Sequence, residues 1–208
     1  EVTTVGKVGI ELERRGGTGR RRPRPLAPDE DQSALRAVET QPVAAYMATV
    51  FTDWRPVDDL VTPVPDTASG IYVDLHSYAN EILSAWGQTP SATCSGAPPS
   101  WPPNCAQILR LGRKWAYLSG FDPRVGSLYA VDGSTKDYSY GRLGIPGYTW
   151  EMGSDFFESC SSFTSAVLPD TLAMLKYAMR VPRTPYQTPA GPDAVNVAAP
   201  ALLMFIPM

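Results

Sequence analysis

Proline is the feature that most restricts what this chain can fold into. Its 208 residues include 21 prolines. A proline inside a helix removes a hydrogen bond and clashes with the preceding turn, and it biases the residue before it away from helical backbone. The prolines here fall in blocks between apolar, periodic segments. We therefore expect short helices and strands in an ordered structure that is rich in loops.

Three segments between the proline blocks have the apolar spacing of an amphipathic helix. They are residues 29–53, 106–119 and 170–181. Pro42 is expected to begin a second helix within the first segment or to kink the first helix. Gly120 follows the second segment and is the expected C-terminal cap, because glycine adopts the left-handed conformation that often ends a helix.

Two short apolar segments, residues 71–75 and 148–152, are typical of buried strands, and residues 80–86 are interpreted as a loop. Helices that alternate with short apolar strands predict an α/β fold. We expect a three-layer sandwich, in which a mixed and mostly buried sheet is flanked by helices.

The composition indicates a globular protein with one sizeable core, since 43% of the residues are hydrophobic and 19% are charged. The formal net charge of −3 gives no general attraction to nucleic acid or to an anionic membrane. No apolar stretch reaches the roughly 18 residues that a membrane span needs. We expect a monomer without nucleic-acid or membrane partners.

The two ends of the sequence differ from its middle. Residues 14–25 are basic, rich in glycine and proline, and without apolar periodicity, which is typical of a surface loop or a disordered segment. An anion-binding arm is the alternative, although no aromatic residues are interleaved to stack on bases. Beyond Gly191 the chain is apolar and without pattern. The first residue is Glu1 and no signal segment follows it, so we interpret the start as truncated.

The chain has three cysteines. Cys94 and Cys105 bracket a proline-rich loop that a disulfide could close, which would leave Cys160 unpaired within the chain. Three reduced thiols are the alternative. A disulfide would favour an exported protein in an oxidising compartment.

Two polar residues stand on the predicted strands. His76, the only histidine, follows the first strand, and a catalytic zinc ion needs about three protein ligands. His76 is therefore an ordinary residue, or its partner ligands lie outside this chain. Glu151 lies within the second strand, where burial would raise its proton affinity to a value suited to a general base. The alternative for Glu151 is an ion pair with an arginine, or contact with solvent at the strand end.

Three segments then appear in a characteristic order. Residues 74–78 read Asp-Leu-His-Ser-Tyr, residues 128–141 contain a tyrosine followed by Lys-Asp-Tyr-Ser-Tyr-Gly, and residues 148–152 read Tyr-Thr-Trp-Glu-Met. In these segments the chain resembles the zinc metallocarboxypeptidases of the carboxypeptidase A and carboxypeptidase T type. The resemblance covers residues 28–193, and its last part is similar to the bacterial branch of the family.

The resemblance implies a role for each matching residue. His76 would be a zinc ligand, Glu151 the general base that activates the metal-bound water, and Tyr129 a residue that closes over the substrate. Ser77 and Tyr78 would line the substrate cleft, with simple packing as the alternative. One zinc ion per full-length catalytic domain and the C-termini of peptides or proteins would be the cofactor and the substrate.

Two further residues bear on specificity. Lys136 matches the family's specificity position, where a buried ammonium would favour an acidic C-terminal side chain, and a surface lysine is the alternative. Arg14 is the nearest match to the arginine that binds the substrate carboxylate. Its neighbour Glu13 stands where the family has asparagine, and a carboxylate there would repel the substrate.

The family's other zinc ligands come from a His-x-x-Glu motif, which this chain lacks. We therefore interpret residues 28–193 as the C-terminal two-thirds of a carboxypeptidase catalytic domain, with an incomplete zinc-carboxypeptidase fold. Residues 1–27 are a diverged or disordered basic segment, and residues 194–208 a linker or the truncated start of a following domain. The chain alone is expected to be inactive and marginally stable, because missing strands leave sheet edges exposed.

The leading functional hypothesis is a secreted bacterial zinc metallocarboxypeptidase that releases C-terminal residues from peptides. One alternative is a protein of the same fold that binds peptides or proteins without cleaving them. Another is a hydrolase of bacterial cell-wall peptides.

Overall fold

The computed structural model describes residues 40–56, 59–88, 93–131, 133–191 and 193–194. Arg14, Glu13 and the interpretations of both chain ends lie outside these residues. The described helices are α2 (Thr40–Val50), α3 (Cys105–Ser119), α4 (Thr135–Leu143), α5 (Cys160–Ser162) and α6 (Leu168–Arg180), with a π-helical turn Phe163–Val167 between the last two and a short 3₁₀ turn Pro185–Gln187 after them. The strands are β1 (Tyr72–His76), β2 (Glu81–Ser84), β3 (Asp122–Val125) and β4 (Gly147–Glu151).

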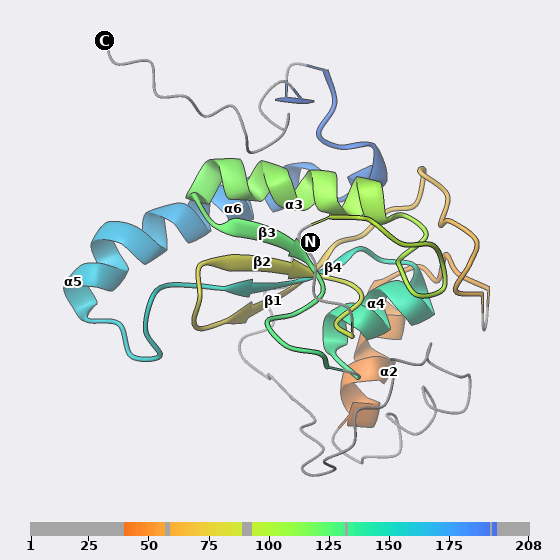
Figure 1. Cartoon of the computed structure of the whole chain (residues 1–208), viewed down its shortest axis with the longest axis horizontal. Coiled ribbons are helices and arrows are strands. Elements are labelled where there is room, and N and C mark those ends of the chain that lie inside the picture. Colours follow the sequence, from red (N-terminus) through yellow and green to blue (C-terminus); the bar gives the residue numbers. More distant parts are fainter. Residues whose placement is uncertain (1–39, 57–58, 89–92, 132, 192, 195–208) are drawn as a thin grey trace.

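These strands form one mixed sheet in the order β1-β4-β2-β3 (Figure 1). Strand β4 pairs in parallel with β1 and antiparallel with β2, and β2 pairs in parallel with β3. Helices α3 and α6 cover one face, while α4 packs against β4 and β1 from the other. The α/β fold with helices on both faces of a mixed sheet is therefore confirmed.

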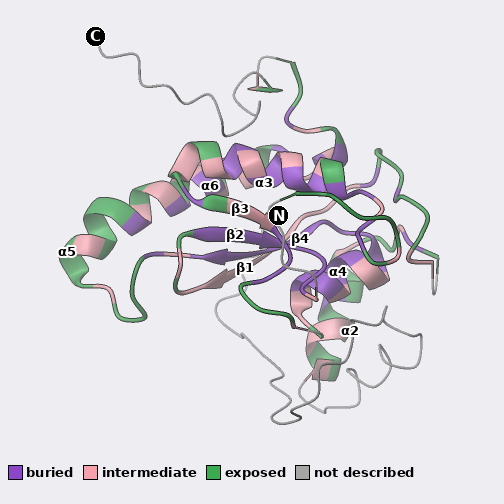
Figure 2. Cartoon of the chain, viewed as in Figure 1, coloured by how far each residue is buried: buried purple, intermediate pink, exposed green. Residues whose placement is uncertain are grey.

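The face under α3 is apolar. The indole of Trp115 on α3 is fully buried and meets two rings of β4 edge to face, with centroid distances of 4.6 Å to Tyr148 and 5.0 Å to Trp150. The Tyr148 hydroxyl donates a hydrogen bond to the carbonyl oxygen of Ile108 at 2.9 Å. Strands β2 and β4 are buried along their whole length, as Figure 2 shows. This side of the sheet holds the main core.

The opposite face of the sheet carries polar side chains at the carboxyl ends of β1 and β4. Side chains alternate between the two faces along a strand, so the residues paired by register point to the same side. Gly147 lies where α4 crosses this face, and a Cβ there would come 2.5 Å from the carbonyl oxygen of Lys136. Because glycine permits this close approach, α4 covers the amino halves of β1 and β4. Their carboxyl ends extend beyond it.

The predicted helices agree with the described ones. The 15-residue helix α3 ends at Gly120, which has the left-handed φ of 77° expected of its cap. Helix α6 ends two residues before Pro182. Helix α2 begins at Thr40 and has Pro42 in its first turn, where proline is tolerated; residues 29–39 lie outside the described part.

One prediction of secondary structure was wrong. Residues 80–86 are not a loop, because Glu81–Ser84 forms β2, a buried inner strand. Its four residues are too few to show alternation, and both end residues are polar. Pairing with β4 and β3, and not local propensity, stabilises this strand. Strand β3 and helix α4 were also not predicted.

Cys94 and Cys105 form a disulfide, and Cys160 is exposed with a free thiol. The predicted pairing is confirmed, and the alternative of three reduced thiols is wrong. Cys105 is the first residue of α3, so the disulfide joins the proline-rich loop to that helix. Within the described residues, no helix combines the length and the apolar character that crossing a bilayer requires.

Candidate functional site

His76 and Glu151 lie side by side on the polar face. They are the last residues of the parallel strands β1 and β4, and the register pairs them directly. His76 Nδ1 is 3.7 Å from Glu151 Oε1, with 27% of the histidine side chain and 11% of the glutamate side chain exposed. The structure thus brings the predicted zinc ligand and the predicted base together at one end of the sheet. Their roles stay predictions.

Asp74 is the second carboxylate beside His76. It lies two residues earlier on β1, on the same face, and its Oδ2 is 3.1 Å from His76 Nε2. The same oxygen accepts a hydrogen bond from Thr135 Oγ1 at 3.0 Å. Burial raises the pKa of Tyr72, on the same face, to about 12, with a further contribution from the charge of Asp74. The imidazole is therefore flanked by carboxylates on both ring nitrogens.

Glu81 extends this arrangement across the sheet. It begins β2, pairs with Glu151 in register, and is equally buried, at 8% exposure for each residue. Its Oε1 is 3.0 Å from Arg124 Nη2. Burial raises the pKa of Glu81, although the Arg124 charge opposes the shift. Sequence reasoning missed Glu81 because it lay in the predicted loop, and only the strand register places it beside Glu151.

Lys136 points inward. Only 1% of its side chain is exposed, and Nζ lies 3.0 Å from Ser134 Oγ and 3.4 Å from Asp137 Oδ1. Both oxygens of Asp137 also accept hydrogen bonds from the Gly87 N–H. The ammonium is therefore buried with a counter-charge at hand, and the alternative of a surface lysine is wrong.

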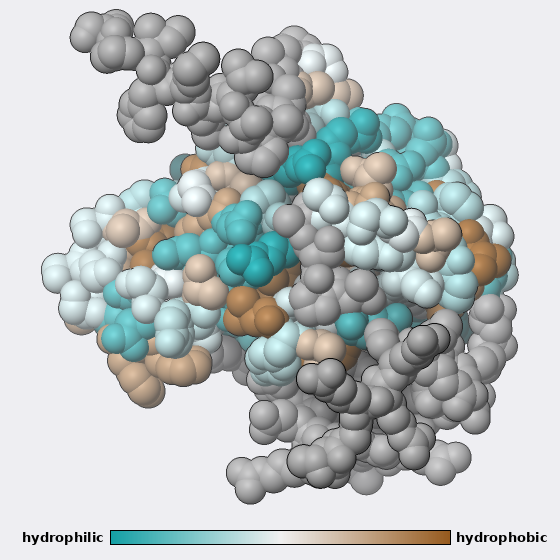
Figure 3. All heavy atoms as spheres, viewed as in Figure 1, coloured by the Kyte–Doolittle hydropathy of each residue, from teal (hydrophilic) through white to brown (hydrophobic). Residues whose placement is uncertain are grey.

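The predicted cleft residues are found in loops near the strand ends. Tyr78 is 42% exposed and stacks edge to face on Phe156 at a centroid distance of 4.8 Å, and the next residue, Phe157, is 91% exposed. Ser77 is half-buried beside it. Tyr129 is 53% exposed in the loop between β3 and α4. Figure 3 shows a small hydrophobic group at its lower left, over the β4–α5 loop, on a mostly hydrophilic face.

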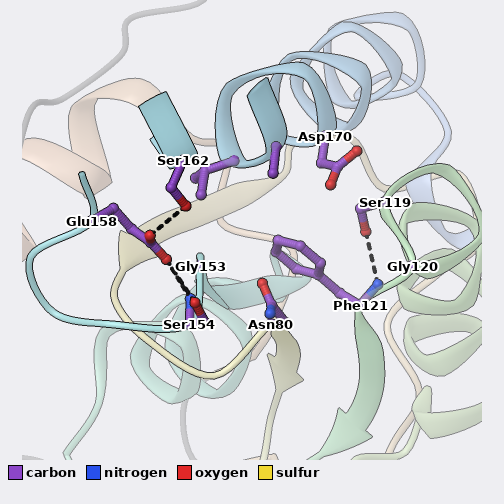
Figure 4. Close-up of a pocket in the computed structure, with 11 residues that line it drawn as sticks. Asn80, Ser119, Gly120, Phe121, Gly153, Ser154, Glu158, Ser162 and Asp170 are labelled. Carbon is purple, nitrogen blue, oxygen red and sulfur yellow. Dashed lines mark hydrogen bonds between the residues drawn. The ribbon is translucent and has the colours of Figure 1, made fainter. Parts of the chain in front are cut away.

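A pocket of about 200 Å³ lies beyond the carboxyl ends of β1 and β4. In Figure 4, Glu158 and Asp170 lie on opposite sides of this pocket, and the Phe121 ring lies among the other lining residues. Hydrogen bonds from Ser162 and Ser154 lower the pKa of Glu158. These bonds already engage the Glu158 carboxylate within the protein, and the pocket is open, with both polar and apolar lining residues.

The described residues do not fit a zinc site by themselves. No three His, Cys, Asp or Glu side chains in the described ranges gather so that they could hold a metal ion. His76 is the only imidazole in the whole chain. A catalytic zinc ion needs more nitrogen, sulfur or carboxylate ligands than this arrangement presents.

Among known proteins, the chain is similar to solved structures. No protein-family model matches the chain, and no curated protein matches it. Carboxypeptidase A from Helicoverpa armigera is similar, with 23% identity and a TM-score of 0.40. The match covers 54% of this chain and 30% of that chain, so the chain spans less than a third of the carboxypeptidase. A likeness of this extent carries no argument about activity.

Proposed function

We propose that this chain is the C-terminal part of a carboxypeptidase-type catalytic domain that releases C-terminal residues from peptides. The observation that carries the proposal is the register pairing of His76 with Glu151, at 3.7 Å between Nδ1 and Oε1. The motif order in the sequence supports it. The Cys94–Cys105 disulfide is in keeping with a secreted protein. We further propose a monomeric, bacterial protein that acts on peptide or protein C-termini.

In this proposal Glu151 is the general base. Its side chain is mostly buried at the end of β4, with Oε1 3.7 Å from His76 Nδ1. Glu151 accepts a proton from the attacking water and returns it to the nitrogen of the departing residue, so one carboxylate serves both steps. The proposed activity depends on zinc, and His76 is one of the zinc ligands in this proposal. The remaining ligands lie outside the described residues.

The source gene provides the test of this function. We expect a His-x-x-Glu motif encoded upstream of this chain, and we expect the product to release C-terminal amino acids from peptides when Zn²⁺ is present. A chelator should abolish the release. Product analysis by mass spectrometry distinguishes a general carboxypeptidase from a hydrolase of cell-wall peptides. The non-catalytic alternative is favoured by the absence of a metal-binding group among the described residues. It would be shown by a gene that lacks the motif and whose product binds peptides but releases no amino acid.

Lys136 is proposed to favour acidic C-terminal side chains. Replacing it by methionine (Lys136→Met) is expected to lower kcat/KM for peptides ending in Glu about tenfold relative to peptides ending in Leu, because a charge-assisted hydrogen bond is lost. The matched control is Lys176→Met, which changes an exposed lysine on α6. An unchanged ratio in Lys136→Met would show that Asp137 already neutralises the ammonium.

A further inference from the structure

Lys136 and Asp137 form a buried ion pair at the start of α4. The lysine Nζ is 3.4 Å from Asp137 Oδ1, and only 1% of the Lys136 side chain and 5% of the Asp137 side chain are exposed. A Cβ on Gly87 would come 2.8 Å from Nζ and 2.9 Å from Asp137 Oδ2, so the glycine leaves room for the pair. Burial of a charge is costly unless an opposite charge accompanies it. Position 136 therefore presents a balanced pair of charges and not an isolated cation.

Asp137 is held in place by contacts other than the lysine. Both of its carboxylate oxygens accept hydrogen bonds from the Gly87 N–H, at 3.1 and 3.0 Å. Its own N–H donates to Ser134, the N-cap residue of α4. The first turn of a helix also favours a negative charge, because the helix N-terminus is partially positive. These contacts keep the carboxylate in position whether or not the ammonium approaches it.

The ammonium of Lys136 is the movable member of the pair. It lies at the end of a flexible four-carbon chain. Its nearer oxygen partner is the uncharged Ser134 Oγ, at 3.0 Å, and Asp137 Oδ1 is farther away, at 3.4 Å. An acidic side chain of a ligand that reaches this ammonium would therefore be the second carboxylate there, in competition with Asp137.

We propose that Asp137 is a specificity-determining residue, which balances the charge of Lys136 and so limits the preference for acidic C-terminal side chains. The inference rests on the proposed function, in which Lys136 meets the C-terminal side chain of a peptide. A peptide that ends in leucine leaves the ion pair intact, whereas a peptide that ends in glutamate adds a second carboxylate to it. The unaltered protein should therefore bind both kinds of peptide.

Replacing Asp137 by asparagine (Asp137→Asn) tests this balance. Asparagine has nearly the same shape and can still accept the Gly87 N–H, but it leaves the buried ammonium without a counter-charge. A peptide that ends in glutamate then supplies the missing charge, and a peptide that ends in leucine does not. We expect the ratio of the two dissociation constants, leucine peptide over glutamate peptide, to rise at least about tenfold.

Isothermal titration calorimetry measures both dissociation constants on the product of the full gene, with two peptides that differ only in their last residue. The protein carries Glu151→Gln so that bound peptides are not cleaved. Asp170→Asn is the matched control, because Asp170 also lies in the first turn of a helix, but α6 covers the other face of the sheet. It should change the ratio less than about twofold, since distant charges are screened. A purely structural role of Asp137 would weaken the binding of both peptides alike and leave the ratio unchanged.

A ratio in folded Asp137→Asn that falls, or stays within about twofold of the original, would overturn the role of Asp137. If circular dichroism shows that this variant is unfolded, its refolding is followed with each peptide. The glutamate peptide should then restore the fold at a concentration at least about tenfold lower than the leucine peptide, because a ligand stabilises the state that binds it. Equal concentrations, or no refolding with either peptide, would overturn the role.

Peptide hydrolysis is assayed separately, on the product of the full gene without substitutions. Binding with the expected change of ratio but without hydrolysis would contradict only the proposed function. Hydrolysis together with an unchanged ratio would contradict only the role of Asp137.

Discussion

Replacing Glu151 by glutamine is expected to lower kcat for peptide hydrolysis by about 10³-fold, because glutamine keeps the shape of the side chain but cannot accept the proton of the attacking water. KM should change little, since the substrate contacts are unaltered. The measurement is steady-state kinetics on the zinc-loaded product of the full gene, with its upstream ligands present.

Glu81→Gln is the matched control for this experiment. Glu81 is a buried glutamate on the same face, directly opposite Glu151 in register and with the same 8% exposure. It should lose less than about tenfold in kcat, because its nearest charged partner is Arg124 and not His76. A loss in Glu81→Gln as large as that in Glu151→Gln, or full activity in Glu151→Gln, would contradict the assignment of the base.

Truncating Trp115 to alanine is expected to destabilise the fold by about 3–5 kcal/mol, the usual cost of removing a large aromatic side chain from a core. The indole is fully buried and packs edge to face on Tyr148 and Trp150, so its loss leaves a cavity between α3 and β4. Such a loss approaches the whole stability of a marginal domain, which is about 5–15 kcal/mol. The free energy of unfolding is measured by urea denaturation with circular dichroism detection.

Tyr117→Ala tests whether this effect comes from burial. Tyr117 lies on the same helix but is 50% exposed, and its ring is 5.3 Å from Lys114 Nζ. Its truncation should cost about 1 kcal/mol or less, the value of an exposed cation–π contact. Equal losses in the two variants would show that α3 does not pack on the sheet through Trp115.

Local pattern was sufficient for helices α3 and α6 and for two of the strands. The spacing of apolar residues predicted α3 and α6, and Gly120 marked the end of α3. Residues 71–75 and 148–152 differ from β1 and β4 only by one residue at the boundaries. These elements have amphipathic or apolar runs that are long enough to be read without knowing their neighbours.

Non-local pairing accounts for what was missed. Strand β2 has only four residues, and it is a strand because β4 and β3 supply hydrogen-bond partners on both sides. The orientation of Lys136 depends on α4 packing closely over Gly147, and its own segment gives no sign of that contact. Both features involve residues that lie far apart in the chain.

The amino-acid sequence alone determined which residue types are available for chemistry. It supplies one imidazole at a strand end, a glutamate on an apolar strand, and cysteines that can close one loop, because these depend on composition and short-range pattern. Only the tertiary structure decided their neighbours. The strand order and register set His76 against Glu151, bring Glu81 to the other side of Glu151, and place Thr135 beside Asp74. The side chains that each face of the sheet buries select that register, and the elements that cover those faces come from distant parts of the chain.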